Sequence, residues 1–401
     1  MTIAGNDEGN STKSFAGLRV LDFSTTIAGP HCTRMLADMG AEVIKIETAE
    51  GETMRTRPPL RDSCSTTFGQ LNVGKKSVVL DLKSPRGIEV VRRLVAGADV
   101  LVENFRPGVM RRLELDYASL GEFNPNLIYC SISGYGQTGP SAELPAYAPV
   151  IHAASGYEMA HLAYQPGRSR PDYCGIYHAD VLTGVYAFGA ISAALYQRSV
   201  SQQGQHIDVS MLESMLSLTL SELQWSQFEV KATQRPMFGP IETSDGYVMV
   251  AIASEKTFQS LMQVIGHPEW VSDPRFAKYA DRREHWASLM DGVEVWSRAV
   301  TTEKCLVALN DHGVPSSAYR TVSEALRDPQ IAHRGALAEV EDGGGTFKVL
   351  NLPFRMSGAT VSAARRMSTL GEHTVAFLKE TGLSEDEIAG FAGKPSMAAR
   401  G

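Results

Sequence analysis

Residues 18–47 read LRVLDFSTTIAGPHCTRMLADMGAEVIKIE, and their pattern decides the fold class. The apolar run at 18–23 is short, as expected of a buried strand, and a loop with Gly and Pro follows it. Apolar residues then recur at helical spacing until Gly40, where a helix is expected to end. Residues 41–47 have the composition of a second strand. The stretch therefore predicts one β-α-β unit.

The same alternation recurs downstream. Strands are expected at residues 76–82, 99–103 and 127–133, and Ser84 followed by Pro85 is a typical start signal for a helix. Strands that alternate with helices predict an α/β fold whose parallel sheet is covered on both faces. Such sheets bind ligands at the loops beyond the carboxyl ends of their strands, so we seek the chemistry there.

Length and composition limit the classes of protein. A chain of 401 residues exceeds one ordinary core and predicts two domains. Its hydrophobic share of 43% and charged share of 21% are typical of a soluble globular protein. The formal net charge of -7 argues against a general nucleic-acid binder. It does not exclude an anionic ligand, because local basic clusters can act inside an acidic protein.

The cysteines and the N-terminus indicate a cytoplasmic protein. The five cysteines are scattered, with no Cys-x-x-Cys spacing, which is typical of reduced thiols. The first residues are small and polar and show no signal peptide, so residues 1–16 are expected to be a disordered extension. We find no apolar run near the roughly 18 residues that a membrane span needs.

Two short patterns point away from common cofactors. Residues 134–139 match G-x-G-x-x-G, but Pro140 follows, so no helix N-terminus is expected there to hold a pyrophosphate. A turn is the favoured interpretation. The ten histidines show no metal-ligand spacing, so no metal site is predicted. His152, His161 and His178 are each interpreted as structural.

Basic residues cluster after or beside the predicted strands. Singly, each is interpreted as a solvated surface residue, but together they suit a polyanionic ligand such as a nucleotide phosphate. The cluster consists of Lys75, Lys76, Lys83, Arg86, Arg106, Arg111 and Arg112.

Asp180 stands at the start of a long predicted helix that runs to about Arg198. An acid in this place is usually a cap that interacts with free amides and the helix dipole. Composition alone therefore favours capping. A catalytic interpretation depends on the family resemblance.

That resemblance rests on a series of ordered blocks. They are LDF at 21–23 with AGP at 28–30, GAEVIKIE at 40–47, KSVVLDLKSPRG at 76–87, VENFRPG at 102–108, ISGYG at 132–136, Asp180 with TG at 183–184, GQ at 204–205 with SMLE at 210–213, and LGEHT at 370–374. With them, the chain from residue 17 to about residue 393 resembles the class III CoA-transferases. That family includes formyl-CoA transferase, carnitine CoA-transferase and, as a branch, α-methylacyl-CoA racemase.

The resemblance implies an architecture. A Rossmann-like large domain would contain residues 17–225 and a return segment at 326–401. A composition change near Gln234 agrees with a smaller α+β domain at 235–325. Two subunits would thread through each other like linked rings, giving an interlocked homodimer.

The resemblance also implies the site residues. Asp180 aligns with the family's nucleophile, and the remaining positions would contact CoA or the acyl-CoA substrate. Those expected near the pantetheine, the reactive end and the thioester pocket are Ile27, Ala28 and Tyr147. Those expected to flank the adenine are Leu80 and Lys83. Those expected to hold the ribose, phosphates and pantetheine are Asn104, Phe105, Arg106 and Arg112.

This chemistry explains why one aspartate would suffice. A carboxylate attacks the acyl-CoA carbonyl and forms a mixed anhydride, and the released thiolate then forms an aspartyl-CoA thioester. An acceptor carboxylate takes over the CoA, and nearby backbone amides would stabilise the oxyanions. Donor and acceptor acids are the expected partners, without a metal.

The chain departs from the family pattern in three places. Ile27 stands where many transferases carry a polar residue. An Arg after the IKIE strand is replaced by Thr48, for which Arg55 would compensate at the CoA. The Gly-rich loop that covers the aspartate in formyl-CoA transferase has no counterpart before Tyr247, which argues against formate and oxalate as substrates.

Three functions compete at this point. CoA transfer is favoured over racemisation because Tyr147 stands where racemases carry a proton-shuttling His. An idle CoA-binding dimer is the third class. Arg168 and Arg170, shortly before Asp180, would bind the distal carboxylate of a dicarboxylic acid such as succinate if they do not simply form a solvated loop.

Overall fold

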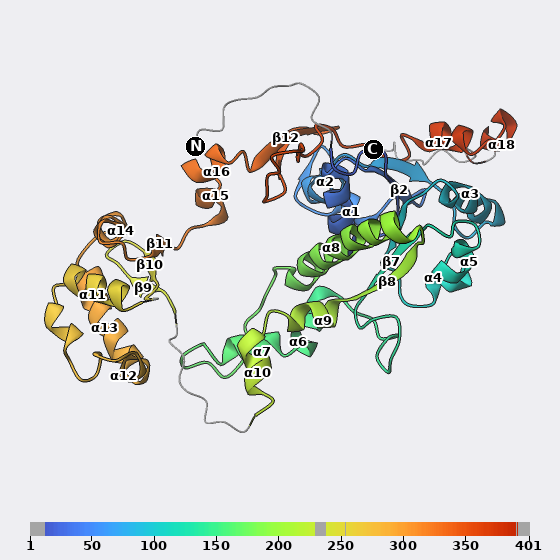
Figure 1. Ribbon diagram of the computed structural model, residues 1–401. Helices are drawn as coiled ribbons and strands as arrows, with labels where there is room; N and C mark the ends of the chain where they lie inside the picture. The colour runs from blue at the N-terminus through green and yellow to red at the C-terminus, as the bar shows by residue number, and fades with distance from the viewer. Residues whose placement is uncertain (1–12, 229–237, 253, 390, 392–401) are drawn as a thin grey trace. The chain divides into compact units, whose positions relative to one another are not determined.

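The computed structural model describes residues 13–228, 238–252, 254–389 and 391, which form two compact units. The larger unit combines the chain up to Leu223 with the segment from His333 onward, and the smaller one spans residues 224–332 (Figure 1). The sequence predicts the small domain at residues 235–325, which lies within this smaller unit.

A parallel sheet of six strands forms the centre of the larger unit, in the order β5-β2-β1-β6-β7-β8. This confirms the predicted α/β fold with a large parallel sheet. The three central strands β1, β6 and β7 are almost entirely buried, as continuous apolar runs require. The strands are β1 (Arg19–Asp22), β2 (Glu42–Glu47), β5 (Lys76–Val79), β6 (Val100–Glu103), β7 (Ile128–Ser133) and β8 (Gln205–Ser210).

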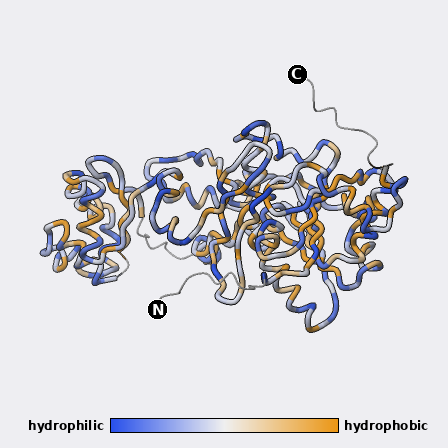
Figure 2. The backbone as a smooth tube through the Cα atoms, turned by 90° about the horizontal axis from the view of Figure 1, so that it is seen from above, coloured by the Kyte–Doolittle hydropathy of each residue, from blue (hydrophilic) through white to orange (hydrophobic). Residues whose placement is uncertain are grey.

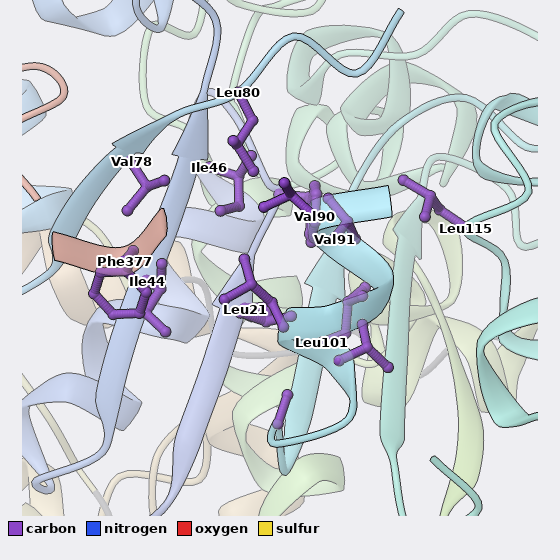
Figure 3. Packing of buried hydrophobic residues seen from close by; sticks show 14 of the residues in the cluster. Leu21, Ile44, Ile46, Val78, Leu80, Val90, Val91, Leu101, Leu115 and Phe377 are labelled. Carbon is purple, nitrogen blue, oxygen red and sulfur yellow. The ribbon is translucent and has the colours of Figure 1, made fainter. Parts of the chain in front are cut away.

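Helices pack on both faces of this sheet. α1 (Ala28–Asp38) and α8 (His178–Ser201) contribute to the core on one face. α3 (Pro85–Val95) and α17 (Thr374–Glu380) contribute to the core on the other. Figure 3 shows Phe377 of α17 beside Ile44 in this second core. The C-terminal segment thus completes the packing that the N-terminal β-α-β unit begins.

The remaining elements of the larger unit are short helices and two-stranded sheets outside the six-stranded sheet. They are α2 (Thr66–Asn72), β3 (Leu60–Arg61), β4 (Cys64–Ser65), α4 (Val109–Arg112), α5 (Tyr117–Gly121), α6 (Ala148–Ala154), α7 (Tyr157–Leu162), α9 (Met211–Leu216), α10 (Leu220–Trp225), β12 (Leu337–Asp342), β13 (Gly345–Leu350) and α18 (Glu385–Ala389), with a 3-10 turn at Thr53–Thr56 and the short α16 (Pro329–His333) at the boundary.

The smaller unit has an antiparallel sheet, β11-β10-β9, and its own apolar core. Along the backbone, apolar segments concentrate where helices and strands pack within each unit (Figure 2). Its elements are β9 (Ile241–Glu242), β10 (Tyr247–Val250), α11 (Glu255–Val264), a 3-10 turn at Pro268–Val271, α12 (Tyr279–Glu284), α13 (Trp286–Ser297), α14 (Thr302–Asp311), β11 (Ser316–Ala318) and α15 (Val322–Ala325).

Residues 13–16, predicted to belong to a disordered extension of residues 1–16, have a defined structure. Residues 1–12 lie outside the described residues, but Lys13 to Ala16 make defined contacts. The Phe15 N–H donates to the Met39 carbonyl at 2.9 Å, and its ring lies 6.2 Å from that of Phe188 on α8. The aromatic side chain of Phe15 packs on the core and so fixes residues 13–16. The polar residues around Phe15 in the sequence gave no sign of this contact.

The sequence analysis found no apolar run of membrane-spanning length, but helix α8 is such a run. Its 24 residues are long and apolar enough to cross a membrane by length and composition alone. A single such helix is weak evidence, because core helices pass the same test. Ala187 and Ile191 of α8 are fully buried in the core.

A network of buried charges holds the loop between β1 and α1. The Lys75 ammonium lies 2.9 Å from Asp22, and the Lys45 ammonium lies 2.6 Å from Glu52 and donates to the Ser24 carbonyl at 2.8 Å. Burial by itself would raise the pKa of Asp22, but the two lysines hold it at about 2. Burial would likewise lower the pKa of Lys45, yet Asp22 and Glu52 raise it.

We predict that Lys45→Met destabilises the protein by about 3–5 kcal/mol, because Glu52 would be left as a buried, unpaired charge. Denaturant unfolding measures the change. Lys379→Met is the matched control. Its ion pair with Glu385 at 3.1 Å is solvent-exposed, so the control should lose less than about 1 kcal/mol. Equal losses in the two variants would contradict a role for the buried network.

Candidate active site

Asp180 lies in the first turn of α8 and lines a pocket of about 190 Å³ beyond the carboxyl ends of β6 and β7. A pocket in this place agrees with the rule for parallel sheets. It brings together six of the residues that the sequence analysis assigned to the site: Ala28, Asn104, Phe105, Arg106, Tyr147 and Asp180.

The Asp180 carboxylate faces the start of a second helix. The Ala28 N–H, the first of α1, donates to it. Burial raises the pKa of Asp180 to about 6, and the hydrogen bond from Ala28 only partly opposes this rise. Asp180 is not the N-cap of its own helix, a place held by Tyr177, so capping does not explain it. Instead it is a desolvated carboxyl group held at another helix's free amides.

Gly184, one turn after Asp180, allows the two helices to approach closely. A Cβ atom at this position would lie 2.7 Å from the Ala28 carbonyl oxygen and 3.0 Å from the His31 ring. Residues four apart share a helix face, so Gly184 sits directly below Asp180 toward α1. The contact between Ala28 and Asp180 therefore depends on a missing side chain.

Asn104 holds the loop that leads to Ala28. Its amide oxygen accepts from the Thr25 N–H and its amide nitrogen donates to the Thr25 carbonyl, both at 2.8 Å. The next amide, of Thr26, donates to Glu52 at 2.6 Å, and Thr26 has a positive φ of 69°. The Asn104 side chain is thus committed to the protein, although it borders the pocket.

A second pocket, of about 620 Å³, adjoins the first and shares Arg106 and Pro107 with it. Arg106, Arg111 and Arg112 line this pocket, and no ion pair is described for any of the three within the described residues. Glu103, Asp116 and Glu143 line the same pocket, but the three guanidinium groups have no described ion pair and can contact phosphates. Arg111 was part of the basic cluster but not of the predicted CoA contacts.

The floor of the larger pocket is a hydrogen-bonded chain that sequence reasoning missed. Ser131 lies between the Glu103 carboxyl and His206, with 2.9 Å between its hydroxyl and the His206 Nε2. Burial raises the pKa of Glu103 to about 7. The three residues come from three neighbouring strands, so no local motif could have revealed them.

Four predicted CoA contacts line neither pocket. Leu80 is 1% exposed within the apolar core, and Ile27 packs with Met54 and Phe68. The Arg55 guanidinium makes two 2.7 Å contacts to Glu47, through Nε and Nη2, and stacks on the Phe68 ring. Lys83 is exposed. The structure does not bring these side chains to Asp180.

Arg168 and Arg170 also lie outside both pockets. Arg168 pairs with Asp172, and Arg170 donates to the Tyr173 hydroxyl at 3.2 Å. Both arginines are exposed, as a solvated loop would be.

Beside Asp180, the structure gathers residues that no spacing rule predicted. One ligand atom each of His152, Cys174 and His178 lies within 4.8 Å of the others. The buried His152 Nε2 accepts the Ala179 N–H at 3.1 Å, so the neutral ring carries its proton on Nδ1. Neither nitrogen then offers a free lone pair. His152 thereby ties α6 to the residue that precedes Asp180.

Residues 15–374 match the family described as CoA-transferase family III. The chain belongs to this family. It is 33% identical to the succinate–glutarate CoA-transferase of Agrobacterium fabrum, with 93% of this chain and 97% of that protein covered. It is 32% identical to the human succinyl-CoA:glutarate CoA-transferase, with 95% and 89% covered. A CAIB/BAIF family protein from Brucella suis superposes with a TM-score of 0.80 at 33% identity, covering 92% of this chain and 100% of that one.

The resemblance drawn from the sequence blocks is thus confirmed. The chain is a CoA-transferase, an enzyme that moves CoA between carboxylic acids. The candidate site with Asp180 lies beyond the strand ends of its six-stranded sheet.

We predict that Gly184→Ala lowers both stability and transfer activity, because the added methyl group would push α1 away and separate the Ala28 amide from Asp180. The cost should be roughly 1–3 kcal/mol, as for other overpacked sites. Thermal unfolding and steady-state transfer rates measure the two effects. Gly121→Ala, in a helix with no atom within 4 Å of the added Cβ, is the control and should keep both values. Full activity in Gly184→Ala would show that the close approach is dispensable.

Proposed function

We propose that Asp180 is the nucleophile of CoA transfer and that the exchanged acids include a dicarboxylate of the succinate type. One observation carries the first part. A desolvated carboxylate held by the Ala28 amide opens into a pocket that continues into a second, arginine-lined pocket. A nucleophile and an anchor for an anionic carrier are thereby placed side by side.

The reaction proceeds in two symmetrical halves. An Asp180 oxygen attacks the acyl-CoA carbonyl, the C–S bond breaks, and CoA leaves as a thiolate while a mixed anhydride forms. The thiolate then attacks the aspartyl carbonyl and releases the donor acid, which leaves Asp180 as a CoA thioester. The acceptor carboxylate repeats both steps in reverse order, and Asp180 is regenerated. No metal takes part in this scheme.

The two pockets support a direction for the bound CoA. We place its phosphates at Arg106, Arg111 and Arg112, and its thioester at Asp180 near Ala28 and Tyr147. The pantetheine would then pass Phe105, which lines the smaller pocket next to Arg106 and Pro107, where the two pockets meet. Contacts by Ile27, Arg55, Leu80 and Lys83 stay predictions that would require a rearrangement of their present surroundings.

The substrate class is supported by the relatives. The names of the Agrobacterium fabrum and human proteins specify succinate or succinyl-CoA together with glutarate. We propose acids of four or five carbons with two carboxylates for this chain. Arg168 and Arg170, if they bind the distal carboxylate, must first leave Asp172 and Tyr173.

We further propose an interlocked homodimer in the cytoplasm. An apolar stripe on the outer face of α8 supports a protein partner: Val185 is 46% exposed, Tyr196 76% and Val200 74%. Five unpaired thiols support a reducing compartment. Light scattering should give twice the mass of 43.5 kDa, and a monomer would contradict the dimer.

Asp180→Ala should bind CoA but lose transfer by at least about a thousandfold, as expected when a covalent nucleophile is removed. The wild-type enzyme, incubated with succinyl-CoA and treated with hydroxylamine, should yield Asp180 hydroxamate by peptide mass spectrometry. The variant should yield none. Retained turnover in the variant would refute the nucleophile, and α-proton exchange without an adduct would indicate racemisation.

Transfer should fall in acid with a midpoint near pH 6. Asp180 attacks only when it is ionised, and its pKa is raised from 3.8 to about 6. The first half-reaction therefore proceeds at full rate above pH 6 and slows as the pH falls below this value. The pH profile of kcat/KM for succinyl-CoA measures this. A midpoint near pH 4, with the protein folded throughout, would contradict the desolvated carboxyl group.

A further inference from the structure

Ser133 carries a buried hydroxyl group without a partner. It ends β7 and is 7% exposed, and its Oγ makes no hydrogen bond within the described residues. A buried hydroxyl left unpaired costs free energy, so proteins rarely keep one without a reason. The same residue lines the pocket that contains Asp180.

Two serines near Ser133 have hydroxyl groups that are hydrogen-bonded, so an unpaired hydroxyl is not general at the ends of these strands. Ser131 lies two positions earlier on β7, hence on the same face, and its hydroxyl is bonded to Glu103 and His206. Ser210 stands opposite Ser133 in the register of β7 and β8, and its hydroxyl caps α9 by accepting the Glu213 N–H at 3.3 Å. Both hydroxyl groups are satisfied by the protein, whereas that of Ser133, a residue that lines the pocket, has no partner within the described residues.

The reaction needs a hydrogen-bond donor beside the acyl group in this pocket. Negative charge develops on the acyl carbonyl oxygen each time Asp180 or the CoA thiolate attacks it. The Ala28 amide is occupied by the Asp180 carboxylate, and the Asn104 amide is occupied by Thr25. Five side chains that line this pocket carry a donor for which no hydrogen bond is described: Thr25, Thr26, Arg106, Tyr147 and Ser133. Of these, Ser133 is the one that is buried.

We propose that Ser133 donates a hydrogen bond to the carbonyl oxygen of the substrate's acyl group. The proposal rests on the function assigned to Asp180. Ser133 forms and breaks no covalent bond. It holds the carbonyl for attack and stabilises the oxyanion, and its empty hydrogen-bonding position is filled when the acyl group arrives.

Ser133→Ala is the test, with succinyl-CoA as donor and glutarate as acceptor. We expect kcat/KM to fall roughly tenfold to a hundredfold, as for the loss of one donor to a developing charge. Formation of the Asp180 adduct in a single turnover should slow by the same factor. Affinity for free CoA, which has no acyl group, should be unchanged, and the melting temperature should not fall, because no hydrogen bond within the protein is lost.

Two further variants make the result decisive. Ser133→Thr keeps a hydroxyl and should recover most of the rate, which a purely steric role would not allow. Ser131→Ala, on the same strand, should show the opposite pattern of a lowered melting temperature, since Glu103 and His206 lose their shared partner.

The outcomes separate this proposal from the one it rests on. If Asp180→Ala is inactive but Ser133→Ala keeps kcat/KM within about twofold, the role of Ser133 is wrong and that of Asp180 stands. A rate loss in Ser133→Ala that tracks a fall in melting temperature and persists in Ser133→Thr would also overturn it. Turnover by Asp180→Ala would instead refute the nucleophile itself.

Discussion

Lys45 and Lys75 lie inside the large unit and bind Glu52 and Asp22, and the geometry of the active site depends on these pairs. Removing four charges from water is costly, and close pairing with additional hydrogen bonds is required to offset it. The paired side chains also position the loop backbone: Glu52 accepts the Thr26 N–H, and Lys45 donates to the Ser24 carbonyl. The loop between β1 and α1 is therefore fixed on both sides, and the Ala28 amide at its end points at Asp180.

This arrangement explains how one carboxyl group can serve as nucleophile. An exposed aspartate is ionised but strongly hydrated, whereas a buried one without a cationic partner has a raised pKa and tends to be protonated. At Asp180, burial raises the pKa to about 6, and the single hydrogen bond from Ala28 keeps the rise moderate. The group is thus ionised near neutral pH with little water to displace. Gly184 and His152 set the same geometry from α8, the first by its missing side chain and the second by accepting the Ala179 N–H.

Much of the fold was readable from local patterns, because parallel strands and their helices leave periodic signals. Residues 18–47 predicted β1, α1 and β2 in order, and the blocks of residues predicted the family. What local patterns could not show depends on tertiary contacts. No local signal shows that Leu80 turns into the core, that Arg55 is held by Glu47, or that Phe15 packs on Phe188. The unpaired state of Ser133 is equally invisible in sequence, since Ser131 looks the same and is fully bonded.

The central claim is that the Asp180 carboxyl group forms both covalent intermediates and exchanges one of its oxygen atoms with the substrates. The scheme moves one acceptor oxygen onto Asp180 when the new acyl-CoA forms, and the next turnover releases it in the donor acid. A single turnover with acceptor acid labelled with oxygen-18 in its carboxylates tests this directly, by mass spectrometry of the peptide that contains Asp180. The account predicts one oxygen-18 atom on Asp180, and transfer that leaves this peptide unlabelled would contradict it.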